Sequence, residues 1–534
     1  MFLRGLPKSP TLEMMYRTIE MKSRGLEVYS LAPGEPYFPT PAEIVEAAHR
    51  AMVEGQTHYV EALGTRAVRN AIAGKVRRLN GIHAEPGDVA FMPNKYALAA
   101  ALQAVVNRGG EVLVPDPGYF YSEAVTLAGG RPIRYRLSDD FSLDIDEIRR
   151  RTGDRTRAIV VNTPSNPTAR VFERSALEEL YEFARDRGIR VLSDEAYEDV
   201  IFEGAHFSVG SLEDSPDTVI SIFSLSKSFS MTGWRAGYVV AGRGILSLIN
   251  KYVEHTMSCF PPFIQAAAAY ALDNQERLVA PMKGECARRR KIVMDALEGI
   301  DGLDVNRIEG TFYAFPRYGL QVGSVKLAEM LLREQRVAVV PGIGFGPSGE
   351  GRFRISFCQR EEELLRGLEG LRAFFRRSNS GSSSRGRGRE SMDSDNMQMD
   401  GRGGLRRSVD AFYGCAYLDE SIAYRASTLQ RPLERAVSAP RGLHVQLHDL
   451  WRSARQRHPH GALHIGIAAQ RRQECAEEGG AGEHPGLSEL SRAQFLGYPG
   501  ALRRKRADAP VARGLHQRFV VDDEAAFSQP FEGF

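Results

Sequence analysis

The chain has 534 residues, and 70 Lys and Arg against 67 Asp and Glu give it a formal net charge of +3. This near balance argues against a protein that mainly coats nucleic acid or an anionic membrane. Hydrophobic residues make up 43% of the chain, which lies in the range of soluble globular proteins and excludes a wholly disordered or collagen-like chain. Small-molecule chemistry is therefore the first class of function to consider.

Targeting and redox signals are weak along the whole chain. No apolar run reaches the roughly 18 residues of a membrane-spanning helix, and the first residues do not form a signal peptide, so we expect a cytoplasmic protein without a membrane span. The cysteines are widely spaced and never form a C-x-x-C pair, so neither a disulfide framework nor a metal site is expected. They are Cys259, Cys286, Cys358, Cys415 and Cys475.

Predicted strands and helices alternate through the first two thirds of the chain. Residues 158–161, 190–193 and 218–222 are apolar runs that predict buried strands, and residues 177–187 predict a helix between the first two. Repeated strand–helix–strand order indicates an α/β fold with a mostly parallel sheet and helices on both faces.

Amino-acid usage changes sharply near residue 378. Nine lysines lie between Lys8 and Lys326, but Lys505 is the only lysine after Arg377, among more than twenty arginines. The change begins with a Gly/Ser/Arg run at 378–389, which has too few apolar side chains to order itself. We therefore expect a globular part that ends at residue 377 and a mostly disordered tail at 378–534.

Polar side chains follow each of the three predicted strands. Asn166 follows the first strand, Asp194 and Tyr197 follow the second, and Lys227 and Arg235 follow the third. Ligands of parallel sheets bind at the carboxyl ends of the strands. The pattern therefore places an amide, a carboxylate, a phenol, an amine and a guanidinium at one edge of the sheet.

Six short motifs around these residues occur in a familiar order. They are Gly34-Glu35-Pro36-Tyr37-Phe38-Pro39-Thr40-Pro41, Thr57-His58-Tyr59, Asn166-Pro167-Thr168, Asp194-Glu195-Ala196-Tyr197, Ser226-Lys227 with Gly233-Trp234-Arg235, and Arg354-Ile355-Ser356-Phe357. Through this ordered set, residues 26–375 resemble a class I/II aminotransferase of the aspartate aminotransferase superfamily. The resemblance implies a fold-type I architecture that binds pyridoxal 5'-phosphate.

The resemblance also implies a domain division. Residues 1–44 would contribute to a small domain, residues 45–270 would form the large cofactor-binding domain, and residues 271–377 would complete the small domain.

Four residues would face the reactive part of the cofactor in such an enzyme. Lys227 would form a Schiff base with the cofactor aldehyde and later move a proton as a free amine. Asp194 would face the pyridine nitrogen and keep it protonated, so that the ring can act as an electron sink. Asn166 and Tyr197 would hydrogen-bond the phenolic oxygen of the cofactor.

Other matched residues would hold the phosphate and the ring. The resemblance assigns the phosphate to Arg235, Ser224 and Ser226, and it assigns ring stacking to Tyr119. Tyr59 matches a tyrosine that reaches the phosphate of the neighbouring subunit, which implies a homodimer.

The phosphate-binding helix departs from the family pattern at its start. Pro93-Asn94-Lys95 stands where relatives have a Gly-Gly or Gly-Ala pair before a lysine, and proline has no N–H to donate. We expect Asn94 and Lys95 still to bind the phosphate, although the effect of Pro93 stays open. Ala169 replaces the glycine that usually follows the Asn-Pro-Thr motif.

Substrate binding would depend on Arg354, Asn166 and Gly34. Arg354 matches the arginine that grips the substrate α-carboxylate, because a planar guanidinium donates two parallel hydrogen bonds. Gly34 lies in the loop expected to close over that carboxylate.

The predicted activity is ping-pong transfer of an amino group from an amino acid to a 2-oxo acid. Related C–S lyases and decarboxylases share the same cofactor contacts and remain alternatives, and a cofactor-binding regulator is a weaker one. Aspartate or another common donor with 2-oxoglutarate is implied by the resemblance, but no single residue identifies the substrate pair. The arginine-rich runs of the tail do not by themselves make a nucleic-acid site, and a functional segment, a gene fusion or a reading-frame artefact remain open for it.

Overall fold

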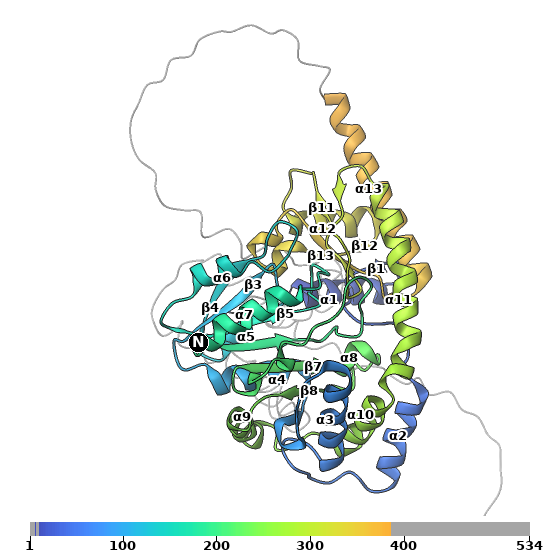
Figure 1. Ribbon diagram of the computed structural model, residues 1–534. Helices are drawn as coiled ribbons and strands as arrows, with labels where there is room; N and C mark the ends of the chain where they lie inside the picture. The colour runs from blue at the N-terminus through green and yellow to red at the C-terminus, as the bar shows by residue number, and fades with distance from the viewer. Residues whose placement is uncertain (1–5, 7–9, 386–534) are drawn as a thin grey trace, which may run out of the picture. The chain divides into compact units, whose positions relative to one another are not determined.

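A seven-stranded sheet forms the centre of the computed structural model, which describes residue 6 and residues 10–385 (Figure 1). The strand order is β2-β8-β7-β6-β5-β3-β4. β8 runs antiparallel to both of its neighbours, and all other neighbouring pairs are parallel, which confirms the expected mostly parallel sheet. The strands are β2 (Val89–Phe91), β3 (Glu111–Asp116), β4 (Arg131–Arg136), β5 (Thr156–Asn162), β6 (Arg190–Asp194), β7 (Val219–Ser224) and β8 (Gly237–Val240).

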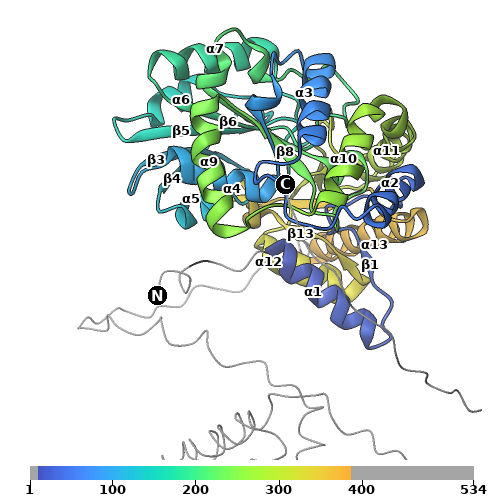
Figure 2. The ribbon, with the colours of Figure 1, turned by 90° about the horizontal axis from the view of Figure 1, so that it is seen from below.

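The sheet is covered by helices on both faces, as Figure 2 shows. Side chains of β5 alternate between two apolar clusters, because successive residues of a strand point to opposite faces. Ala158 and Val160 pack in the cluster that contains the helix at 94–105, whereas Ile159 and Val161 pack with Leu177 of the helix at 174–186. Both faces of the sheet are therefore buried, as the continuous apolar runs predict.

Helices lie before, between and after the strands of the large sheet in the described part of the chain. Those before residue 190 are α1 (Pro10–Ser23), α2 (Ala42–Val53), α3 (Arg66–Asn80), α4 (Asn94–Val105), α5 (Tyr121–Leu127), α6 (Ile145–Arg151) and α7 (Arg174–Asp186). Those after it are α8 (Leu225–Ser228), α9 (Arg243–Thr256), α10 (Pro262–Asp273), α11 (Gln275–Glu298), α12 (Ser324–Gln335) and α13 (Glu361–Arg385). Short 3-10 helices lie at Pro86–Asp88, Val209–Ser211, Ser215–Asp217, Gly342–Phe345 and Pro347–Gly349.

Three small sheets lie apart from the large one, and one of them joins the beginning of the chain to residues 337–338. β1 (Tyr29–Ser30) pairs in parallel with β12 (Val337–Ala338). β10 (Tyr313–Ala314), β14 (Phe353–Ser356) and β13 (Val340–Pro341) form an antiparallel sheet in that order. β9 (Leu303–Asp304) pairs with β11 (Arg317–Tyr318). The domain boundaries at residues 44, 270 and 377 stay predictions.

Helix α13 extends past residue 377, the expected end of the globular part. It continues through residues 378–385, the first part of the Gly/Ser/Arg run that was expected to be disordered. Each residue added to an existing helix gains a backbone hydrogen bond without a new nucleation cost, so an amphipathic helix can extend into a polar segment. Residues 386–534, the rest of the expected tail, lie outside the described residues.

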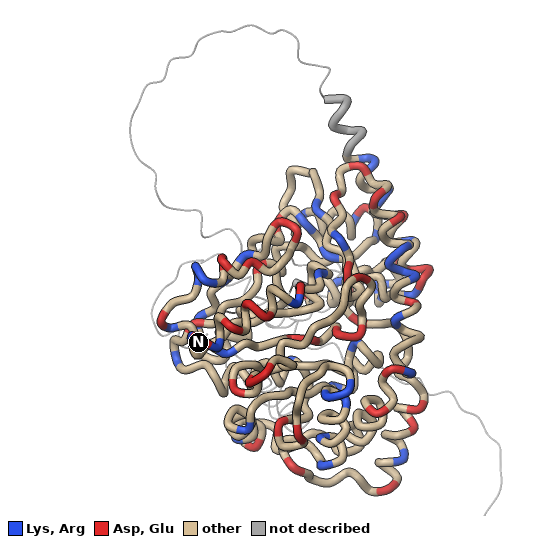
Figure 3. Tube along the Cα trace, viewed as in Figure 1, with Lys and Arg blue, Asp and Glu red and all other residues tan. Residues whose placement is uncertain are grey.

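Charges of both signs are mixed along the described part of the chain (Figure 3). None of its helices combines the length and the apolar character that crossing a bilayer requires. In the same residues, no group of three or more His, Cys, Asp and Glu side chains is arranged to hold a metal ion.

Candidate active site

Three neighbouring parallel strands end at the same edge of the sheet. β5 ends at Asn162, β6 at Asp194 and β7 at Ser224, and Asn162 lies opposite Asp194 in the ladder. Asn166 and Lys227 follow β5 and β7 within four residues. The parallel register therefore brings the segments that carry the predicted site residues together.

Asp194 is buried and accepts three hydrogen bonds. Tyr121 Oη donates to Oδ2 at 2.8 Å, whereas Asn94 Nδ2 and the backbone N–H of Ala196 donate to Oδ1 at 3.1 Å and 3.2 Å. Burial raises the pKa of the Asp194 carboxyl, and these donors act in the opposite direction. The carboxylate is thus held in one orientation, and the sequence did not point to Tyr121 as one of its partners.

Lys227 lies on the short helix α8, directly after the strand edge. Its Nζ donates to the carbonyl oxygen of Gly34 at 2.6 Å, and it makes no ion pair within residues 10–385. Burial lowers the pKa of the amine to about 8; the negative charge of Glu35 opposes this shift, and the positive charges of Arg354 and Arg235 add to it. At pH 7 about a tenth of this amine is unprotonated, which is the form that attacks an aldehyde.

Arg354 lies on β14 and is buried. Its Nη1 donates to Asn166 Oδ1 at 3.1 Å, and its Nη2 donates to the carbonyl oxygen of Ala32 at 2.7 Å. The guanidinium stacks over the ring of Tyr313, 4.3 Å from the ring centroid. Nε has no hydrogen-bond partner, and the described residues offer Arg354 no carboxylate. A buried cation with a spare donor fits an incoming carboxylate.

Tyr313 is a site residue that the sequence motifs did not reveal. Its hydroxyl lies 2.8 Å from the hydroxyl of Tyr197, and both rings are buried. A Cβ added to Gly34 would lie 2.4 Å from the Tyr313 hydroxyl oxygen, so a side chain at position 34 would collide with it. Tyr313 therefore links the predicted Tyr197, Gly34 and Arg354, although no local pattern marks it.

The start of α4 shows how Pro93 is accommodated. Pro93 is the N-cap residue, and the first closed turn runs from Ala97 N–H to the Pro93 carbonyl oxygen at 2.8 Å. Its missing N–H lies outside the helix, where proline is tolerated. The backbone N–H groups of Asn94 and Lys95 are not used by the helix, because the first turn of any helix leaves its N–H groups free.

Further predicted cofactor ligands lie around this edge. Ser224 caps α8, and its Oγ accepts a hydrogen bond from the N–H of the buried Ser226 at 3.2 Å. Arg235 is exposed, adopts a left-handed backbone conformation at φ 58°, and donates to the Thr232 carbonyl oxygen at 2.7 Å. Its guanidinium therefore donates to a backbone carbonyl oxygen and forms no ion pair with a described carboxylate.

Aromatic rings lie beside these groups. The Nζ of Lys95 lies 5.6 Å from the centroid of the Tyr119 ring, and Tyr119 lies edge-on to Tyr121 at 5.9 Å. Tyr121 in turn binds Asp194. Tyr119 thus belongs to the same group of side chains as the carboxylate.

Tyr59 is the predicted residue that the fold does not bring to the site. Its side chain is 88% exposed, and no contact joins it to the other predicted site residues within the described chain. Its proposed role therefore needs a second subunit.

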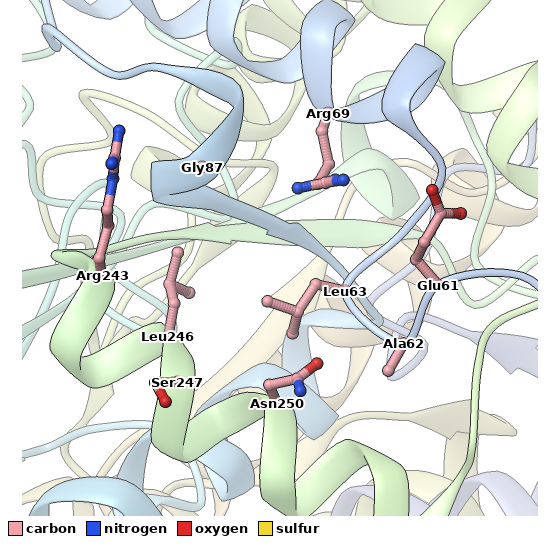
Figure 4. A pocket seen from close by; sticks show the side chains of 9 residues that line it. All are labelled: Glu61, Ala62, Leu63, Arg69, Gly87, Arg243, Leu246, Ser247 and Asn250. Carbon is pink, nitrogen blue, oxygen red and sulfur yellow. The ribbon is translucent and has the colours of Figure 1, made fainter.

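A separate surface pocket of about 380 Å³ lies beside α9 and contains none of the predicted site residues. Figure 4 shows Leu246, Ser247 and Asn250 along α9 and Arg69 from α3 on the other side. Its lining contains no lysine, and its one carboxylate, Glu61, is exposed, so the strand edge remains the candidate site.

The residues at the strand edge fit pyridoxal 5'-phosphate. They include a half-buried lysine without an ion-pair partner among the described residues, an oriented carboxylate, and an arginine whose Nε lacks a partner. A mostly parallel sheet that presents this set beyond its strand ends defines a fold-type I pyridoxal-phosphate enzyme.

Comparison with known proteins identifies the family. The family described as aminotransferase class I and II matches residues 27–371, and the chain belongs to it. It is a pyridoxal-phosphate-dependent transaminase, and this assignment does not favour the lyase, decarboxylase and regulator alternatives.

Relatives and solved structures agree with this assignment. The chain is 37% identical to aspartate aminotransferase of Pyrococcus abyssi over 66% of this chain and 92% of that protein. It is 35% identical to a probable aspartate/prephenate aminotransferase of Aquifex aeolicus over 69% and 96%. The structure of Thermus thermophilus aspartate aminotransferase with maleate is 33% identical, with a TM-score of 0.67 over 70% of this chain and 98% of that one.

Proposed function

We propose that Lys227 and Arg354 are the two central groups of the transamination site. The observation that carries the proposal is that Arg354 is buried, Lys227 is half-buried, and neither cation has an ion-pair partner among residues 10–385, while their charges influence each other. Two cations withdrawn from solvent without ion-pair partners are costly in an isolated protein, so their arrangement is understandable if ligands supply the missing partners. Lys227 would take the cofactor aldehyde, and Arg354 would take the substrate α-carboxylate.

When bound, pyridoxal 5'-phosphate supplies an aldehyde that bonds covalently to an amine and a ring that accepts electrons from the substrate α-carbon. The chain supplies orientation and proton transfer. Asp194, held by Asn94 and Tyr121, would present a fixed negative charge to the pyridine nitrogen.

The other end of the cofactor needs donors for the phosphate. We assign this role to the hydroxyls of Ser224 and Ser226, the guanidinium of Arg235, and the free backbone N–H groups of Asn94 and Lys95 at the start of α4. A helix N-terminus favours an anion because its N–H groups point outward and its dipole is positive there. Tyr119 would stack on the ring.

Substrate orientation follows from the contacts of Arg354. Asn166 and the Ala32 carbonyl fix the guanidinium plane, so a carboxylate that binds its free edge has a defined direction. Asn166 and Tyr197 would also hydrogen-bond the phenolic oxygen of the cofactor. Lys227, with its pKa lowered to about 8, would then accept and return the proton of the substrate α-carbon.

The substrates are proposed to be an α-amino acid and a 2-oxo acid. Relatives named for aspartate, aspartate/prephenate and aromatic amino acids support a screen that starts with aspartate, phenylalanine and tyrosine as donors and 2-oxoglutarate as acceptor. Lys227→Ala is the decisive variant, because it should lose the visible absorbance of bound cofactor and all measurable turnover. Full turnover by this variant would contradict the proposal.

We also propose a homodimer in the cytoplasm, with Tyr59 of one subunit at the phosphate of the other. The exposed side chain of Tyr59 and the unfilled contacts of Arg235 support this arrangement. A complementation experiment tests it. Lys227→Ala and a Tyr59→Ala variant of reduced activity are mixed in the unfolded state and refolded together. Activity should return, because one site of the mixed dimer contains both native residues. No recovery in verified mixed dimers would contradict shared sites.

A further inference from the structure

A buried hydrogen bond connects the lysine helix to the segment that carries Asp194 and Tyr197. Ser228, the residue after Lys227, donates its hydroxyl to Asp199 Oδ2 at 2.5 Å. Ser228 is buried, and Asp199 is only two residues beyond Tyr197. One hydrogen bond therefore ties together the two segments that would touch opposite parts of the cofactor.

The same carboxylate also anchors a third element. Gln275 Nε2 donates to Asp199 Oδ1 at 2.8 Å and to Oδ2 at 2.9 Å. Gln275 is the first residue of the long helix α11, which packs against α13 (Figure 1). Asp199 is thus a three-way junction between α8, α11 and the segment after β6.

Helix α8 is held at both ends by serine hydroxyls. Ser224 caps its first turn, and Ser228, its last residue, is fixed by Asp199. Lys227 lies between these two anchors. A four-residue helix has little stability of its own, so its orientation depends on such tertiary contacts.

The segment that carries Asp199 is itself rigidly held. The neighbouring Glu198 pairs with the buried Lys75 at 2.5 Å, and it also accepts a hydrogen bond from Asn80 at 2.6 Å. Burial raises the pKa of the Asp199 carboxyl, as does the charge of Glu198, whereas Lys75, Ser228 and Gln275 act in the opposite direction. These contacts restrict movement of the segment, so the hydrogen bond between Asp199 and Ser228 also restricts movement of α8.

We propose that Asp199 is a positioning residue for Lys227. Through Ser228 it fixes the orientation of the lysine relative to Asp194 and Tyr197, and it makes no contact with the reacting atoms. The inference rests on the proposed role of Lys227, and it adds a residue that lies outside the matched motif positions.

Three variants of the holoenzyme separate geometry from charge. Ser228→Ala and Asp199→Ala each remove the tie. Asp199→Asn keeps a carbonyl oxygen for Ser228. Its N–H can bond Gln275 Oε1, which is buried and has no partner among the described residues, once the Gln275 amide turns over and presents that oxygen. The Asn variant should therefore rescue what the Ala variant loses.

Turnover and the pH titration of the visible cofactor band are the readouts. We expect each Ala variant to lower kcat about three- to tenfold, the effect of losing the buried hydrogen bond between Ser228 and Asp199 that both variants break, with KM within about twofold. The midpoint of the band titration should shift by about 0.3 pH unit or more, because the midpoint reports the environment of Lys227. Asp199→Asn should stay within about twofold of the native kcat. The double variant Asp199→Ala/Ser228→Ala should lose no more than Asp199→Ala alone, since Asp199→Ala already breaks the bond to Ser228.

Ser215→Ala is the matched control. Ser215 is also buried, and its hydroxyl donates to the Gly210 carbonyl oxygen at 2.7 Å, away from α8. This variant should alter melting temperature without changing kcat or the titration. If the two Ala variants behave like this control, or if Asp199→Asn is as impaired as Asp199→Ala, the positioning role is overturned. Failure of the proposed function itself would appear separately, as full turnover by Lys227→Ala.

Discussion

The hydroxyl groups of Tyr197 and Tyr313 lie 2.8 Å apart, although 116 positions separate the two residues in the chain. Burial raises the pKa of both phenols, to about 12 for Tyr313, so both stay protonated near neutral pH. One hydroxyl donates and the other accepts. The guanidinium of Arg354 lies over the Tyr313 ring, so Tyr313 touches both the residue proposed to bind the cofactor oxygen and the residue proposed to bind the substrate carboxylate.

Tyr313→Phe should therefore impair catalysis more than substrate binding. The variant keeps the ring under Arg354 but removes the hydrogen bond to Tyr197. Loss of a buried partner costs about 1–3 kcal/mol, so kcat should fall at least about fivefold while KM for the amino donor changes little. Steady-state kinetics measure both values. Tyr318→Phe, which removes a buried tyrosine hydroxyl bonded to the Val322 carbonyl oxygen, serves as the control. A native kcat in Tyr313→Phe would contradict the expected role.

Arg354→Lys should weaken binding of the amino donor. A lysine carries the same charge but cannot donate two parallel hydrogen bonds or stack on Tyr313 in the same way. We expect kcat/KM to fall about 10- to 100-fold, mainly through KM, because hydrogen bonds to charged groups are worth about 1.5–3 kcal/mol. Arg352→Lys is a matched control, since Arg352 also stacks on a ring, 4.7 Å from the Phe141 centroid, but lies outside the site. Equal losses in both variants would argue against a specific carboxylate contact.

The desolvated amine of Lys227 should make the cofactor-free protein less stable at neutral pH. Its pKa is lowered from the usual 10.5 to about 8, so the unfolded chain binds more protons between these values. Stability should therefore rise with pH from about 8 to 10.5, by about 1–3 kcal/mol from this group. Lys227→Met removes the charge, so the variant should be more stable than the native chain at pH 7, with a difference that shrinks toward pH 10.5.

Chemical unfolding of the cofactor-free proteins at several pH values measures this difference. Lys251→Met changes an exposed lysine and is the control, since it should not alter the pH dependence. If the native chain were more stable than Lys227→Met at neutral pH, the expected sign would be wrong.

Ala169→Gly should stabilise the protein. Ala169 adopts a left-handed conformation at φ 59°, which is strained for a residue with a Cβ, and its carbonyl oxygen accepts hydrogen bonds from Glu309 and Gly310. We expect a gain of about 0.5–1 kcal/mol and a higher melting temperature. Ala47→Gly in helix α2 should lose about 1 kcal/mol instead, because there the glycine only adds unfolded-state freedom. A loss in both variants would show that position 169 is unstrained.

Removal of residues 386–534 should leave transamination intact. The proposed site residues lie between Gly34 and Arg354, and the family match ends at residue 371. Purified full-length and shortened proteins, compared for kcat, KM and bound cofactor, provide the measurement. A shortened protein that folds and binds cofactor but has lost turnover would assign the segment a catalytic part.

Much of the fold was predictable because its signals are local. Apolar runs of strand length marked β5, β6 and β7, and α7 lies within three residues of its predicted start. The end of α13 was not predictable from the sequence. The helix propensity of a Gly/Ser/Arg run is low, and it does not take into account that a preceding helix stabilises the residues added to its end. Pro93 raised a doubt that only the helix start at Asn94 resolved, because its effect depends on whether it lies inside or outside the first turn.

The sequence by itself determined which chemical groups follow which strands, because each motif is a short stretch of neighbouring residues. Parallel strands then place these stretches at one edge of the sheet. Tertiary structure alone decided how these groups are held. Asn94 meets Asp194 across 100 positions, Arg354 meets Asn166 across 188, and Asp199 joins Ser228 to Gln275. Contacts of this kind depend on packing distances of a few ångströms between remote segments, and one-dimensional patterns of residue type do not contain those distances.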